Sequence, residues 1–156
     1  MVKIEKIISG GQTGADRAAL DFAIEHNIPY AGWLPKGRKT EDGTLDLKYH
    51  LQEMPTTDYP KRTERNVLDA DGTVIVSLGF LTGGSALTAE FAKRHKKPWI
   101  HIDLKELAIK EAVQRLDGWL TSHGIKVLNV AGPRTRKDPA IYEATLRLLE
   151  ATFPKG

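Results

Sequence analysis

Glycine-rich segments that could bind an anion occur at three places, each after an apolar stretch and before a helical pattern. They are residues 10–14, residues 79–84 and Gly132. Glycine lets the backbone approach a bound anion closely, and a helix N-terminus offers unpaired N–H groups and a partial positive charge. A tight turn explains any single cluster equally well, but three clusters at one edge of a sheet favour an anion or nucleotide site.

The first cluster, at residues 10–14, matches neither of the common phosphate-binding motifs. No Gly-Lys-Ser/Thr follows it, as a Walker loop requires, and its spacing is not Gly-x-Gly-x-x-Gly. Gln12 and Thr13 could donate side-chain hydrogen bonds to a phosphate or a base, and Asp16 and Arg17 follow in the first helical turn. Alternatively, Asp16 only stabilises the positive end of the helix, and Arg17 is a solvated helix residue.

The second cluster, at residues 79–84, leads into a helix whose first turns carry hydroxyl groups. Ser85 and Thr88 lie within reach of a phosphate bound at the start of this helix. Glu90 follows in the second turn, where it could hydrogen-bond a ribose or act as a base, or be an ordinary exposed residue. This cluster therefore offers a phosphate site with a candidate catalytic carboxylate nearby.

Basic residues gather between and after the glycine clusters. Arg134 follows the third cluster directly, on the expected ligand edge of the sheet. Its forked guanidinium suits a phosphate group, and we expect Arg62 and Arg65 to contribute in the same way. The basic residues that we expect to be solvated are Lys39, Lys61 and Lys137.

Several other kinds of site are disfavoured by the residues present. The chain has no cysteine, which removes disulfides, thiolate metal sites and thiol nucleophiles. Its five histidines show no i, i+4 spacing of the kind that binds metal on a helix, and no Gly-x-Ser-x-Gly elbow is present. We therefore expect neither a protein-ligated metal nor an acyl-transfer hydrolase.

Length and composition indicate one globular domain spanning residues 1–156. Hydrophobic residues make up 40% of the chain and charged residues 28%, with a formal net charge of +3. This charge is too small to indicate a nucleic-acid partner. No signal peptide or membrane span is visible, so a cytoplasmic location with no membrane partner is the simplest expectation.

Strand and helix patterns alternate along the chain. The spacing predicts strands at residues 6–9, 28–33, 73–77, 98–102 and 125–130. It predicts helices starting at Ala15, at Ala86 after an N-cap at Ser85, at an Asp103–Glu106 capping box, and at Asp138–Pro139. This alternation predicts an α/β fold with a mainly parallel, doubly wound sheet covered on both faces, which makes three layers. Residues 34–60 are too long for a plain connection and are expected to form a functional loop or lid.

Five motifs lie along the chain at residues 9–17, 32–38, 41–43, 62–67 and 131–134. Together they resemble the motifs of the molybdenum carrier (molybdenum cofactor carrier) family. The resemblance implies a Rossmann-like sheet, a homo-oligomer (dimer or tetramer), and binding of molybdenum cofactor, a phosphorylated pterin. This family is related to the circularly permuted YpsA-like branch of a superfamily that includes lysine-decarboxylase-like phosphoribohydrolases and DprA proteins.

The related phosphoribohydrolases carry Pro-Gly-Gly-x-Gly-Thr-x-x-Glu at their central loop, and this chain keeps only half of it. Gly83, Gly84 and Glu90 hold their places, and Arg62 lies at a plausible spacing for the arginine that those enzymes use. The departures are Thr82 for the proline, Ala86 for the third glycine and Leu87 for the threonine. Because alanine narrows the backbone approach to a phosphate, we expect a binding protein more than an efficient hydrolase.

The residues are consistent with three functions. The favoured one is a carrier that holds a phosphorylated heterocycle without turnover. The alternatives are a nucleoside 5′-monophosphate phosphoribohydrolase that uses Glu90 and Arg62, and a nucleotide-sensing module. The residues do not separate a pterin from a purine, since Trp33 or Phe80 could stack on either. The candidate binding residues are Gly10, Gly11, Gln12, Thr13, Gly14, Asp16, Arg17, Lys36, Arg38, Arg65, Gly83, Gly84, Ser85, Thr88 and Arg134.

Overall fold

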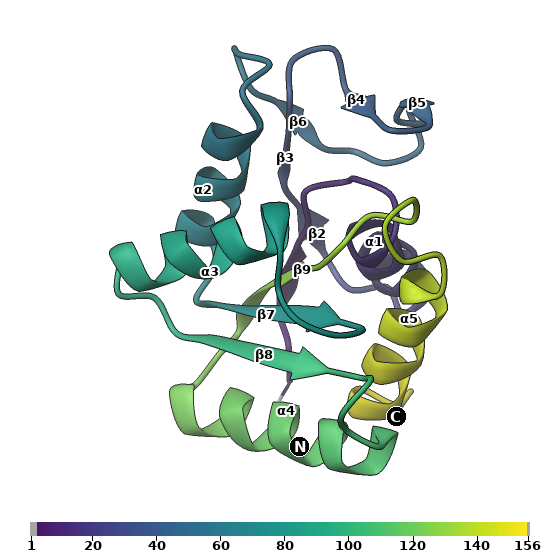
Figure 1. Ribbon diagram of the computed structural model, residues 1–156, viewed down its shortest axis with the longest axis vertical. Coiled ribbons are helices and arrows are strands. Elements are labelled where there is room, and N and C mark those ends of the chain that lie inside the picture. The colour runs from purple at the N-terminus through teal and green to yellow at the C-terminus, as the bar shows by residue number, and fades with distance from the viewer. Residues whose placement is uncertain (1–2, 156) are drawn as a thin grey trace.

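A five-stranded parallel sheet forms the centre of the computed structural model, which describes residues 3–155 (Figure 1). The strand order is β2-β1-β9-β7-β8, and every neighbouring pair is parallel. This arrangement confirms the expected α/β class. The strands are β1 (Lys6–Ile8), β2 (Tyr30–Ala31), β7 (Gly72–Ser77), β8 (Trp99–Asp103) and β9 (Val127–Ala131).

Helices cover both faces of this sheet, as a doubly wound fold requires. The helices α1 (Ala15–Glu25), α4 (Ile109–His123) and α5 (Ile141–Thr152) share one large core with the strands. The helices α2 (Tyr59–Asp69) and α3 (Gly83–Arg94) pack together over the other face, with a much smaller core. Each fully buried large apolar side chain contributes about 1.5–3 kcal/mol, so the α1, α4 and α5 face supplies most of the stabilisation.

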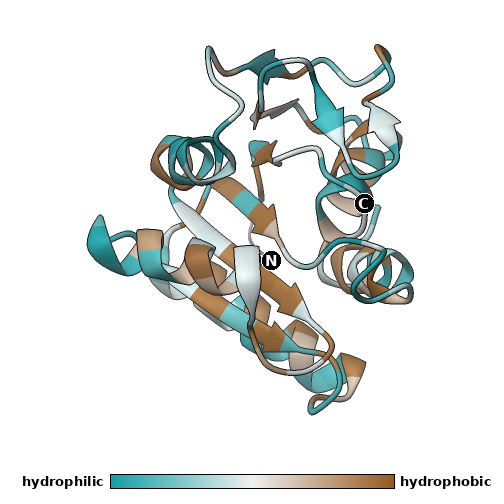
Figure 2. Ribbon diagram, turned by 45° about the horizontal axis from the view of Figure 1, so that its top comes forward, coloured by the Kyte–Doolittle hydropathy of each residue, from teal (hydrophilic) through white to brown (hydrophobic). Residues whose placement is uncertain are grey.

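The hydropathy of β7 explains its position inside the sheet, between β9 and β8. All six residues of this strand are buried, and four of them are the consecutive run Thr-Val-Ile-Val. A strand of a parallel sheet is buried on both faces, which favours a continuous β-branched run over an alternating one. Figure 2 shows such apolar strands at the centre, between helices with hydrophilic outer surfaces.

The stretch after β1 and α1 is more structured than the loop expected at residues 34–60. It contains β3 (Trp33–Leu34), which pairs with β6 (Gln52–Glu53), and a hairpin of β4 (Lys39–Thr40) and β5 (Gly43–Thr44). We call residues 33–53 the β3–β6 segment. A small core of its own holds this segment against α1: Leu20, Leu34, Leu45, Tyr49 and Leu51.

Two predicted elements differ in their boundaries because of glycine and turn geometry. The single strand expected at residues 28–33 is divided at Gly32 into β2 and β3, which belong to different sheets. A Cβ at Gly32 would lie 1.8 Å from the carbonyl oxygen of Ser9, so only glycine fits there. The N-cap of α3 is Thr82 and not Ser85, which places the two glycines 83–84 inside the first turn of the helix.

The predicted capping box at Asp103 is wrong, and the helix starts later. The Asp103 carboxylate accepts the N–H groups of Gly79 and Lys105 at 2.9 Å each. Residues 104–107 form turns, and α4 begins only at Ile109. The last helix likewise begins at Ile141, three residues after Asp138. Within residues 3–155, no helix is apolar and long enough to span a membrane.

Candidate ligand-binding site

A cavity of about 420 Å³ lies where the strands β1, β7 and β9 end. The helix after β1, α1, covers one face of the sheet and the helix after β7, α3, covers the other (Figure 1), and residues of both helices line the cavity. Ligands of doubly wound folds bind at this kind of crossover point. The predicted site residues that line the cavity are Gly10, Gln12, Asp16, Arg62, Gly83, Gly84, Ser85, Thr88 and Arg134.

The start of α3 presents open backbone to this cavity. The N-cap residue Thr82 makes no side-chain capping hydrogen bond, and the first N–H groups of a helix have no acceptor within it. A Cβ added at Gly83 or Gly84 would meet no atom within 4 Å. The Thr88 hydroxyl is engaged, since it donates to the carbonyl oxygen of Gly84 at 2.9 Å. This helix start therefore has space and free N–H groups for an anion.

The start of α1 is packed much more tightly. Its N-cap is Gly14, with φ of 81°, and a Cβ there would lie 2.4 Å from the carbonyl oxygen of Pro133. A Cβ at Gly11 would lie 2.7 Å from the Leu34 side chain. Both positions must therefore be glycine, because the neighbouring chain leaves no room for a side chain. Neither glycine lines the cavity.

A buried ion pair crosses the cavity between α1 and α2. Nη1 of Arg62 lies 3.7 Å from Oδ2 of Asp16, and the two side chains are only 11% and 9% exposed. Burial raises the pKa of Asp16, while Arg62 partly offsets this effect. Burial also lowers the pKa of Arg62, which Asp16 opposes. Since a guanidinium stays charged in proteins, Arg62 brings a fixed positive charge to the site, and its buried Nε has no hydrogen-bond partner.

A second arginine stands beside the first without a carboxylate partner. Arg134 lies over the Tyr59 ring at 4.7 Å, and Arg62 approaches the same ring at 5.7 Å. Among residues 3–155, no ion pair or side-chain hydrogen bond involves the Arg134 guanidinium. With Arg136 and Lys137, four cations line the cavity against the carboxylates of two acidic residues. The cavity therefore favours an anionic ligand.

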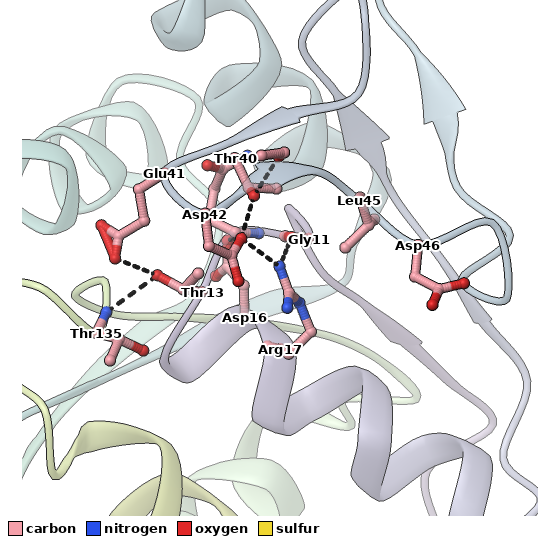
Figure 3. A network of polar contacts seen from close by, with 12 residues as sticks. Gly11, Thr13, Asp16, Arg17, Thr40, Glu41, Asp42, Leu45, Asp46 and Thr135 are labelled. Carbon is pink, nitrogen blue, oxygen red and sulfur yellow. Dashed lines mark hydrogen bonds and ion pairs between the residues drawn. The ribbon is translucent and has the colours of Figure 1, made fainter.

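The carboxylate of Glu41 holds the β4–β5 hairpin against the segments before α1 and after β9 (Figure 3). Glu41 accepts hydrogen bonds from the Thr13 hydroxyl at 2.6 Å and from the Arg136 N–H at 3.0 Å. Thr13 in turn accepts the N–H of Thr135 at 3.1 Å. Arg17 contacts Asp42 at 3.7 Å. Thr13 and Arg17 therefore hold the hairpin and do not line the cavity.

The structure places the remaining candidate residues outside the cavity. Arg38 donates to four backbone carbonyl oxygens within the β3–β6 segment, and the exposed Lys36 precedes it there. The guanidinium of Arg65 lies 4.6 Å from the centre of the Trp33 ring, so these two side chains pack on each other and not on a ligand in the cavity. Glu90 is exposed and lies 3.8 Å from Lys93 on its own helix.

Seven polar residues of the cavity were missed or misjudged in the sequence: Glu41, Thr63, Asn66, Thr82, Asn129, Arg136 and Lys137. Lys137 was expected to be solvated, but it lines the cavity. The position of Asn129, within the otherwise apolar run Val-Leu-Asn-Val, is a signal that could have found it. Among residues 3–155, no group of three or more His, Cys, Asp or Glu side chains could hold a metal ion.

Comparison with known proteins identifies the class to which this fold and cavity belong. Residues 7–153 match the circularly permutated YpsA SLOG family, so the chain belongs to that family. A solved structure described as "Putative molybdenum carrier protein" from Syntrophus aciditrophicus SB is 62% identical, with a TM-score of 0.96. This likeness covers 97% of the present chain and 96% of the other. A search of curated proteins finds no match. The resemblance drawn from the motifs and the Rossmann-like fold are thereby confirmed.

Proposed function

We propose that this chain is a molybdenum cofactor carrier that holds the phosphorylated pterin in the cavity between α1 and α3, without turnover. The observation that carries this proposal is the unpartnered Arg134 beside the open start of α3, in a cavity with four cations. The 62% identical structure described as a molybdenum carrier supports the choice of ligand.

The proposed binding mode assigns the phosphate to the start of α3. The N–H groups of Gly83 and Gly84 and the hydroxyl of Ser85 would donate to the phosphate oxygens, and Arg134 would neutralise their charge. The heterocycle would extend toward Asp16 at the start of α1. Since the chain has no cysteine, the protein would hold its cargo through the pterin and phosphate rather than through a thiolate on the metal.

The position of Glu90 favours binding over hydrolysis. In the phosphoribohydrolase hypothesis this carboxylate acts at the ligand, but here it is 64% exposed and paired with Lys93. It does not line the cavity. Assays with several nucleoside 5′-monophosphates should therefore release no free base. Base release that is lost in Glu90→Ala would contradict the carrier proposal.

The direct test is retention of molybdenum by the purified protein. After incubation with molybdenum cofactor and gel filtration, molybdenum should co-elute with the protein, and the cofactor should decay more slowly than in buffer. Arg134→Ala should reduce the retained molybdenum about tenfold, because a charge-assisted contact is lost.

Arg94→Ala provides a matched control for this test. Arg94 also lies over an aromatic ring, Phe91 at 5.1 Å, but outside the cavity. Its removal should leave molybdenum retention unchanged. Retention by the wild-type protein no greater than by an unrelated protein would refute the proposal, and equal losses in both variants would refute the role of Arg134.

A further inference from the structure

Hydrogen-bond acceptors gather on the α1 side of the cavity, opposite the start of α3. Gln12 is 2% exposed, and its Nε2 donates to the carbonyl oxygen of Lys39 at 3.0 Å. This bond fixes the orientation of the amide, because a flipped amide would set two oxygens against each other. The buried Oε1 of Gln12 is left without a partner, and an unpaired buried acceptor destabilises the folded protein.

Two carboxylates that line the cavity, those of Asp16 and Glu41, bond to residues 12 and 13 and can accept further hydrogen bonds. Asp16 accepts the N–H of Gln12 through Oδ2, and Glu41 accepts its two hydrogen bonds through Oε2. Within residues 3–155, no hydrogen bond to the second oxygen of either carboxylate is found. Both residues line the cavity. Apart from Arg62, which lies 3.7 Å from Oδ2 of Asp16, this side of the cavity offers acceptors, so a ligand that pairs with them must supply N–H or O–H donors.

The opposite side of the cavity has the reverse character. The start of α3 supplies N–H donors, and Arg134 supplies a positive charge. A ligand that satisfies both sides carries its anionic group at one end and adjacent N–H donors at the other. A carboxylate accepts such adjacent donors in pairs, as it does from the fork of a guanidinium.

We propose that this cavity selects heterocycles in which an amino group adjoins a ring N–H, the edge that pterin and guanine share, over adenine and hypoxanthine. The inference rests on the proposed function and defines the ligand class of that same site. Adenine would set a ring-nitrogen acceptor against the carboxylates, and hypoxanthine lacks the amino donor. A site with buried polar groups rejects an analogue that leaves them unpaired more strongly than an apolar site does.

Calorimetric titration of the purified protein with guanosine, inosine and adenosine 5′-monophosphates tests this selection. Guanosine monophosphate should bind about tenfold more tightly than inosine monophosphate, because the amino group satisfies an acceptor that is otherwise unpaired. Adenosine monophosphate should bind more weakly than either. In Glu41→Gln, an NH2 donor takes the place of the carboxylate oxygen that has no hydrogen bond. The preference for guanosine over inosine monophosphate should then fall below threefold.

Glu90→Gln is the control, because it makes the same chemical change at an exposed carboxylate outside the cavity. It should leave the preference unchanged. Equal binding of the guanosine and inosine compounds, or binding that requires Mg²⁺, would overturn the selection while leaving the carrier proposal intact. Failure of guanosine monophosphate to bind, in a protein that retains molybdenum cofactor, would also overturn it. Loss of molybdenum retention itself would instead refute the carrier proposal.

Discussion

The two glycine loops that open α1 and α3 are alike in sequence but differ in what surrounds their glycines. In the first loop, a Cβ at Gly10 would lie 1.7 Å from Nη1 of Arg62, and one at Gly14 would lie 2.4 Å from the carbonyl oxygen of Pro133. In the loop that opens α3, a Cβ at Gly83 or Gly84 would meet no other part of the protein within 4 Å.

This difference separates glycines that the fold needs from glycines that leave space for a ligand. In the first loop, the absence of side chains at the glycines lets Arg62 and the chain after β9 approach α1. The second loop borders the cavity with Thr82, Gly83 and Gly84, and its two glycines place no side chain there. A glycine-rich turn therefore does not by itself mark a phosphate site, and the surroundings of each glycine decide which role it has.

The largest effect that we expect is from Gly14→Ala. This substitution combines a φ of 81°, unfavourable for alanine, with a clash at the Pro133 carbonyl. We expect it to lower the free energy of unfolding by about 4 kcal/mol, measured by urea denaturation. Gly37→Ala separates the two causes, because Gly37 has φ of 86° but open space around it. It should cost only about 1 kcal/mol; equal losses would argue against the clash.

Arg62→Met should have the next largest effect, because it leaves Asp16 buried without its cation. Removing one partner of a buried pair costs about 3 kcal/mol at neutral pH. Since the pKa of folded Asp16 is raised above 3.8, the stability linked to its protonation is present below that pH and is lost as pH rises through the folded pKa. Loss of Arg62 raises this pKa further.

The pH dependence of unfolding provides the control for Arg62→Met. The stability of this variant should fall from acid toward neutral pH more steeply than that of the wild-type protein. The double variant Asp16→Asn/Arg62→Met should lack the extra slope. An extra slope that persists in the double variant would show that another group is responsible.

Much of the fold followed from local patterns in the sequence. The run of β7, the apolar spacing of α1 and the turn glycines were sufficient to predict a parallel sheet with helices on both faces. The capping box at Asp103 failed because its carboxylate bonds to Gly79 across the sheet edge. The polar helix α2 was not predicted from periodicity, since only three of its residues are buried.

The site was predictable where it follows strand ends and unpredictable where it depends on distant contacts. The positions of Gly84, Ser85 and Arg134 at the cavity were predictable because parallel strands place their carboxyl ends at one edge. Glu41 was not, because its place in the cavity depends on a hairpin that folds back onto residues 13 and 136. Arg38 was misjudged because its carbonyl partners lie in an irregular segment.

The substitution with the smallest expected effect on stability, Gly84→Ala, tests the role of the second loop in ligand binding. Gly84 has ordinary helical space around it, and alanine is the better helix former. The free energy of unfolding should therefore stay equal or rise by about 0.5 kcal/mol. Because the methyl group would occupy the space where the backbone meets the phosphate, ligand binding should nevertheless weaken.

The most direct test of the phosphate site at the start of α3 compares the affinities of the wild-type protein and Gly84→Ala for molybdenum cofactor. The thermal unfolding of both proteins is measured alongside. A loss of about tenfold in affinity with an equal or higher midpoint of thermal unfolding is the predicted result, because the substitution narrows the backbone approach without disturbing the fold. Unchanged affinity in Gly84→Ala would contradict the assignment of the α3 start as the phosphate site.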